Sequence, residues 1–158
     1  MKKVLIALDF DPSAQTVAES GYALAKSMNA QIYLLHVVSD ATYYSSLNYS
    51  PIMGFDSFSN MDIIQTEAVV ELQEAAKEFL DKSRQHLGDP NIQTITRGGD
   101  FGDTIIDVAT EINADIIVMG THSRRGLEKI LMGSVAEKVL RKSAVPMFII
   151  PTKVKDNE

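Results

Sequence analysis

Two glycines frame the part of the chain that is best suited to bind an anion. Gly120 follows the apolar run Ile116 to Met119, and Gly133 directly precedes Ser134 and a helical pattern. This order predicts a strand, a loop and the N-terminus of a helix, with Gly120 giving the backbone freedom to leave the strand. The first amides of a helix lack intrahelical acceptors, so they are natural donors to a phosphate group.

The loop between these glycines carries polar and basic side chains that suit an anionic ligand. A second interpretation needs no ligand, because Gly120 can simply end the strand while Ser134 and Glu137 form a capping box at the helix start. Spacing alone leaves both interpretations open. The loop residues expected to face a ligand include Thr121, His122, Ser123 and Arg124.

Five apolar segments alternate with four helical patterns along the chain, and this alternation predicts an α/β domain with a mainly parallel sheet. If the first strand is central and the chain reverses direction after the third, the sheet has a switch point between the first and fourth strands. That arrangement would place Asp9 beside Gly120, in the crevice where ligands bind in such folds. The expected strands are residues 4–8, 32–38, 92–97, 114–119 and 146–150.

Local signals predict where the helices between these strands begin and end. Asp11 and Pro12 are expected as the N-cap and first residue of a helix that runs to about Met28. A long helix from about residue 61 should stop at Gly88, and Asp100 should cap the next one.

Composition narrows the class of protein. The 158 residues are 45% apolar, so we expect one domain over residues 1–152 and a short tail at 153–158. A net charge of −6 disfavours a broad nucleic-acid surface. The absence of cysteine excludes disulfides and thiolate chemistry, and no apolar run approaches the roughly 18 residues that span a bilayer, so a cytoplasmic protein is expected.

Catalytic and metal-binding patterns are weak. His36, His86 and His122 fall on different elements, and the chain contains neither a nucleophile elbow, a P-loop nor a dinucleotide fingerprint. We therefore assign no catalytic residue and no dedicated metal cluster. Residues 39–60 lack periodicity, and they are read either as a lid or interaction loop or as a partly disordered insertion.

The glycine-rich region resembles the nucleotide-binding signature of the universal stress protein family: glycine, two residues, glycine, nine residues, glycine, then Ser or Thr. Here the signature begins at Gly120, has Ser123 in place of the second glycine, and ends at Gly133 and Ser134. The resemblance covers nearly the whole chain. It also includes the segments KKVLIALDFDPSA, LLHVV, ADIIVMGTHSRRG and LMGSVAEKVLRKSAVPMFII.

The resemblance implies a three-layer Rossmann-like fold of the adenine nucleotide α-hydrolase type, with ATP, ADP or AMP as ligand and any Mg²⁺ held through the phosphates. It also implies a homodimer through the last strand, Pro146 to Ile150. In this chain Ala7, Asp9 and the backbone of Val37 would contact the nucleoside. The phosphates would lie against Gly120, His122, Ser123, Arg124, Gly133, Ser134 and the Val135 amide.

Ser123 is the departure from the signature that decides between functions. A serine adds a Cβ that can crowd the phosphates, whereas its hydroxyl can donate to them. The preferred hypothesis is an adenine-nucleotide-binding stress regulator that acts as a homodimer. The alternatives are a nucleotide-free dimeric interaction module of the same fold and a slow ATPase.

Overall fold

The computed structural model describes residues 1–10, 12–38, 61–121 and 133–152, and for residues 61–69 it describes the backbone alone. The segment at 39–60 and the site residues His122, Ser123 and Arg124 lie outside the described residues.

One five-stranded sheet forms the centre of the described part of the chain, and all its neighbouring strands are parallel. The order is β3-β2-β1-β4-β5, so the chain does reverse direction after the third strand and the predicted switch point between the first and fourth strands is confirmed. The strands are β1 (Lys3–Ala7), β2 (Gln31–Val38), β3 (Gln93–Gly98), β4 (Ile116–Gly120) and β5 (Met147–Ile150).

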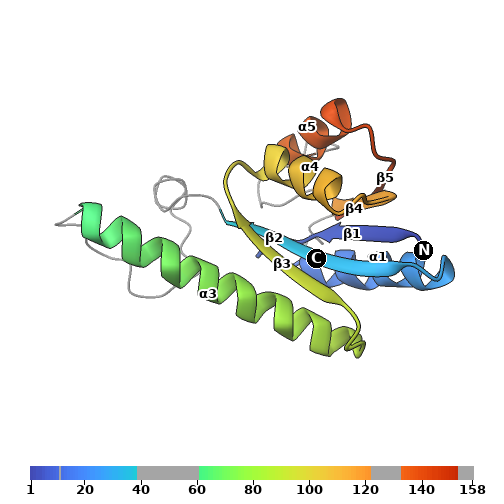
Figure 1. Ribbon diagram of the computed structural model, residues 1–158, viewed down its shortest axis with the longest axis horizontal. Coiled ribbons are helices and arrows are strands. Elements are labelled where there is room, and N and C mark those ends of the chain that lie inside the picture. The colour runs from blue at the N-terminus through green and yellow to red at the C-terminus, as the bar shows by residue number, and fades with distance from the viewer. Residues whose placement is uncertain (11, 39–60, 122–132, 153–158) are drawn as a thin grey trace, which may run out of the picture.

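Helices cover both faces of this sheet, which confirms the α/β class and the three layers. The described helices are α1 (Ala14–Ser27), α3 (Met61–Leu87), α4 (Phe101–Glu111) and α5 (Ser134–Lys142). α4 and α5 lie together on one side of the sheet, and α1 and α3 lie on the other (Figure 1). Short parallel strands need such helical crossovers, and the crossovers bury both faces of the sheet.

Each sheet face has its own core because successive side chains of a strand point to opposite sides. Ile6, Leu34 and Val118 pack towards α1 and α3, whereas Leu35 and Ile117 pack towards α4 and α5. Gly21 lets α1 lie close to the sheet. A Cβ there would be 2.8 Å from the Cδ1 of Ile6 and 3.1 Å from the Cγ1 of Val118.

The predicted helix boundaries are partly right. Asp100 caps α4, since its side chain accepts from the Asp103 amide, and Gly88 ends α3 with a φ of 71°. The start of α1 was predicted wrongly. The helix begins at Ala14 after Ser13, and Pro12 lies in the preceding turn, because the chain continues beyond β1 before the helical hydrogen bonds begin at Val17 N–H to Ser13 O.

Within the described residues, every helix is too short or too polar to cross a membrane.

Candidate functional site

The carboxyl ends of β1 and β4 meet at the switch point, where the predicted site residues come from neighbouring strands. Ile6 lies opposite Val118 in the register, and extending the register by two residues puts Leu8 opposite Gly120. Ala7 is the last residue of β1, and half-buried Asp9 follows two residues later. The fold therefore brings the Asp9 backbone to the end of β4, as the sequence predicted.

The start of α5 has amides without an intrahelical acceptor, and it lies at the same edge of the sheet. Gly133 is the N-cap, and the first intrahelical bond runs from the Glu137 amide to the Gly133 carbonyl at 3.0 Å. The amides of Ser134, Val135 and Ala136 precede that bond, so they have no intrahelical acceptor. Their partial positive charge and the helix dipole favour an anion here.

The capping box expected at this helix is wrong. Ser134 is the first helical residue, not the N-cap, and the N-cap Gly133 has no side chain that could accept from the helix amides. The Glu137 carboxylate instead bonds to Arg141 one turn along α5. The local interpretation that needed no ligand thus does not account for the helix start.

Neither glycine of the site is needed for an unusual backbone angle, and Gly120 is needed for space. Gly120 is not among the glycines with positive φ in the described residues, which corrects the expectation that it frees the backbone to turn. A Cβ on Gly120 would lie 2.9 Å from the Val17 Cγ2 and 3.0 Å from the Thr152 Cγ2. Gly133 is extended, with φ −67° and ψ 158°, a conformation that any residue adopts.

The Gly133 amide has a hydrogen-bond acceptor within the protein. It donates to the Thr121 carbonyl. The amides of the three residues that follow it are the ones without an intrahelical acceptor. Thr121, expected at the ligand side, is instead buried, with 8% of its surface exposed and its hydroxyl next to Thr152. That expectation was wrong because the side chain faces β5.

Val37 lies near the end of β2 with its side chain buried on the α4 and α5 side. The Leu8 amide donates to the Leu35 carbonyl at 2.8 Å, so the alternation of a parallel strand directs the Val37 carbonyl to the same side, towards β1. The β1 strand ends at Ala7, level with Leu35. The Val37 carbonyl therefore points towards the segment that follows the end of β1.

His36 ties the ends of β1 and β2 together from the opposite face. Its Nδ1 lies 2.8 Å from the Leu8 carbonyl, and because a carbonyl only accepts, Nδ1 carries the proton. The ring is 1% exposed and packs against Phe10 and Phe79, with centroid distances of 4.3 and 5.6 Å. Burial lowers the pKa of His36, opposed by its bond to Leu8.

This buried histidine should make stability fall in mild acid. Because its pKa is lowered in the folded state, the unfolded chain binds the proton first as pH drops below about 6.5, and folding loses up to about 1.4 kcal/mol per pH unit. His36→Asn keeps a donor for Leu8 but cannot be protonated. Urea unfolding at pH 7.5, 6.5 and 5.5 should show a smaller loss of stability in this variant than in the wild type.

His86→Asn is the matched control, since it removes an exposed histidine whose Nε2 lies 2.7 Å from Glu19 on the helical surface. The acid-dependent loss caused by His36 should persist in it. An equally steep loss in His36→Asn and in the wild type would contradict the assignment.

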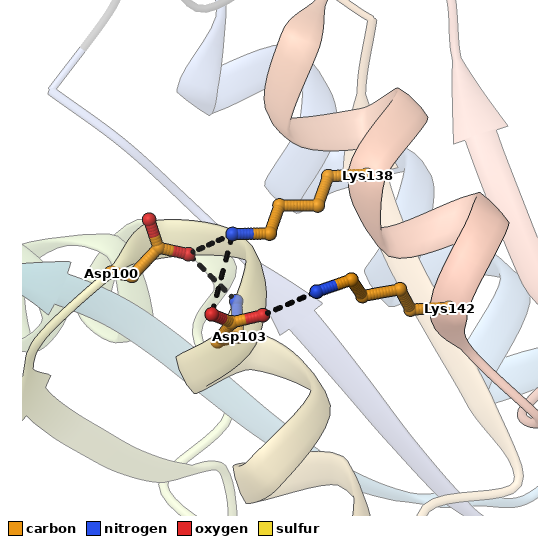
Figure 2. A network of polar contacts seen from close by, with 4 residues as sticks. All are labelled: Asp100, Asp103, Lys138 and Lys142. Carbon is orange, nitrogen blue, oxygen red and sulfur yellow. Dashed lines mark hydrogen bonds and ion pairs between the residues drawn. The ribbon is translucent and has the colours of Figure 1, made fainter.

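Charged side chains join α4 to α5 one turn after the N-terminus of α5 (Figure 2). The Lys138 Nζ lies 2.8 Å from Asp100 Oδ2 and 3.3 Å from Asp103 Oδ2, and Lys142 Nζ lies 3.4 Å from Asp103 Oδ1. The Lys138 stem passes over Gly102, where a Cβ would be 2.8 Å from the lysine Cδ. This link was not predicted from the sequence, in which the missing side chain at Gly102 is its only local signal.

The Asp100 carboxylate accepts hydrogen bonds from the Lys138 ammonium group and the Asp103 amide, and both lower its pKa. Its hydrogen bond from Lys138 is the main cause that lowers the pKa of Asp100, and the Asp103 amide adds to it. The same contact raises the pKa of Lys138. The pair is exposed to solvent, so we expect it to orient the two helices more than to stabilise the fold.

Lys138→Met should raise the pKa of the Asp100 carboxyl towards its ordinary value, because methionine keeps the stem over Gly102 and removes the ammonium group. Carboxyl ¹³C NMR titration measures this directly. Lys142→Met is the matched control, since Lys142 reaches Asp103 and not Asp100. An unchanged Asp100 titration in Lys138→Met would refute the contact.

Among the described residues, no three His, Asp or Glu side chains converge to hold a metal ion. A magnesium ion held through nucleotide phosphates remains a prediction.

The fold and the site define an α/β protein in which the N-terminus of α5 lies beside the switch point of a parallel sheet. The sequence profile of the universal stress protein family matches residues 1–151, and the chain belongs to that family. Universal stress protein MJ0531 of Methanocaldococcus jannaschii is 30% identical over 155 residues, which cover 98% of this chain and 85% of that protein.

Solved structures agree with the fold. The structure of MJ0577, also from Methanocaldococcus jannaschii, matches with a TM-score of 0.76 at 26% identity, and 98% of each chain is covered. A universal stress protein solved in complex with cAMP matches with a TM-score of 0.62 at 19% identity, covering 94% of this chain and 96% of that one. The family resemblance and the three-layer fold expected from the sequence are thereby confirmed.

Proposed function

We propose that this protein binds an adenine nucleotide, with ATP, ADP or AMP as candidates, at the carboxyl edge of the sheet. The observation that carries the proposal is the mouth of α5, where the amides of Ser134, Val135 and Ala136 have no intrahelical acceptor and open beside the switch point. Helix amides in this position suit phosphate oxygens. The Ser134 side chain is exposed beside them and can donate a further hydrogen bond.

The nucleoside would lie on the other side of the switch point, over the ends of β1 and β2. The backbone of Val37 would recognise the adenine edge, and Ala7 and Asp9 would contact the nucleoside, with the Asp9 carboxylate suited to accept from ribose hydroxyls. The cAMP complex of a distant relative supports an adenine-containing ligand in this fold. Gly120, His122, Ser123, Arg124 and Gly133 would complete the phosphate side, and Mg²⁺ would be held through the phosphates.

We further propose that the protein is a cytoplasmic stress-response regulator that acts as a homodimer through Pro146 to Ile150. The edge strand β5 pairs with β4 on one side, and Phe148 within it is 40% exposed. An open apolar edge of this kind favours pairing with a second strand. Nucleotide occupancy at the nearby helix mouth would then alter a surface that protein partners recognise.

Nucleotide content of the purified protein tests the proposal. Protein released by heat should yield an adenine nucleotide on chromatography, and ligand-free protein should bind ATP in a calorimetric titration. If extraction and titration are both negative, Ser123 has removed binding and the nucleotide-free interaction module of the same fold is correct. Accumulation of ADP in the titrated sample would instead indicate a slow ATPase.

A further inference from the structure

Thr121 joins three elements that meet at the helix mouth. Its amide donates to the Ile150 carbonyl of β5 at 3.0 Å, and its hydroxyl accepts from the Thr152 amide at 3.0 Å. Its carbonyl accepts from the Gly133 amide at the start of α5. One residue after β4 thus contacts both the end of the edge strand and the N-cap of the phosphate-facing helix.

The link is buried, so its hydrogen bonds matter more than those of a surface threonine. Thr121 is 8% exposed and Thr152 is 6% exposed, and their hydroxyl oxygens lie 3.4 Å apart. The Thr152 methyl packs where a Cβ on Gly120 would be, which explains why this turn has no room for another side chain. A buried amide that loses its acceptor bears a desolvation cost, so the turn would shift to recover a partner.

These hydrogen bonds determine where the N-terminal amides of α5 lie. The Ile150 carbonyl holds the Thr121 amide and the Thr152 amide holds the Thr121 hydroxyl, so Thr121 is fixed on its backbone and its side chain. Its carbonyl, which belongs to the following peptide group, then locates the Gly133 amide. Because the free amides of α5 begin at the next residue, their position depends on Thr121. Misplacing preorganised donors by a fraction of an ångström weakens the binding of an anion.

We propose that Thr121 is a positioning residue for the phosphate-binding amides of α5 and couples them to the edge strand β5. This inference rests on the proposed nucleotide binding. The Thr121 hydroxyl accepts from the Thr152 amide, so we place Thr121 behind the phosphate-binding amides and not among the groups that contact the phosphate. Its effect is on the polyphosphate end of the ligand, so adenosine, which lacks phosphate, should not sense it.

Calorimetric titration with ATP and with adenosine separates this role from a general effect on folding. Thr121→Val keeps the shape and the backbone bonds but removes the hydroxyl acceptor, and it should weaken ATP binding about five- to tenfold, the equivalent of one hydrogen bond, with adenosine affinity unchanged. Thr121→Ser restores the hydroxyl and should bind ATP within about twofold of the wild type. Thr110→Val is the matched control, because the Thr110 hydroxyl donates to the Ile106 carbonyl within α4.

Amide hydrogen exchange of the ligand-free protein gives a second measurement. Exchange at Gly133 and Thr152 should be faster in Thr121→Val than in Thr110→Val, while amides in the centre of β1 keep their protection. Equal ATP affinity of Thr121→Val and the wild type, or an equal loss of adenosine affinity, would overturn the positioning role alone. A folded wild type that binds no ATP would overturn the proposed function together with this inference.

Discussion

Gly133→Val should lower the affinity for ATP at least about a hundredfold, because the new side chain would stand beside the free amides of α5. Gly133 has φ −67° and ψ 158°, backbone angles that valine also adopts, so the amide can keep its bond to Thr121. Hydrogen bonds to a charged phosphate contribute roughly 1.5–3 kcal/mol each, and losing two of them exceeds two powers of ten. Isothermal titration with ATP measures the loss.

Three controls make that result specific. Ala144→Val adds the same kind of bulk at the exposed end that follows α5 and should leave ATP affinity unchanged. Adenosine should bind Gly133→Val and the wild type alike, and the thermal midpoint and mass of the assembly should be retained. Unaltered ATP affinity in a folded Gly133→Val would place the phosphates somewhere other than the mouth of α5.

Hydrophobic patterning was sufficient to predict the α/β class, whereas the strand order was predicted only on the condition that the first strand is central. Continuous apolar runs such as residues 4–8 and 32–38 indicate strands that are buried on both faces, and such strands require helical crossovers. Once the chain alternates in this way, chain reversal after the third strand puts Asp9 near the end of β4. The glycine at position 133 then falls at the helix mouth, because its helix must return over the sheet from the same edge.

Such patterns could not predict contacts between residues that are distant in sequence. Ser134 and Glu137 have the spacing of a capping box, yet the Thr121 carbonyl holds the Gly133 amide and starts the helix one residue earlier. Gly120 resembles a turn glycine, but its requirement comes from Val17 and Thr152, which lie on α1 and after β5. These requirements arise from tertiary packing, which no local window of sequence contains.

The outward edge of β5 provides a way to test the dimer without damaging the sheet. The Ile117 amide donates to the Pro146 carbonyl and the Thr121 amide donates to the Ile150 carbonyl. Since backbone groups alternate along a parallel strand, residues 146, 148 and 150 face β4, whereas the amides of Met147 and Ile149 point to the open edge. Proline is tolerated on an edge strand where its missing N–H faces outward.

Ile149→Pro should therefore convert a homodimer to a monomer, because it removes an outward amide and adds a ring where a second strand would approach. Light scattering during size-exclusion chromatography measures the mass, and circular dichroism verifies the fold. Ile149→Val keeps the amide and most of the packing towards α4 and α5, so it should remain dimeric. A folded Ile149→Pro that stays dimeric, or a wild type that is monomeric at every concentration, would show that β5 is not the interface.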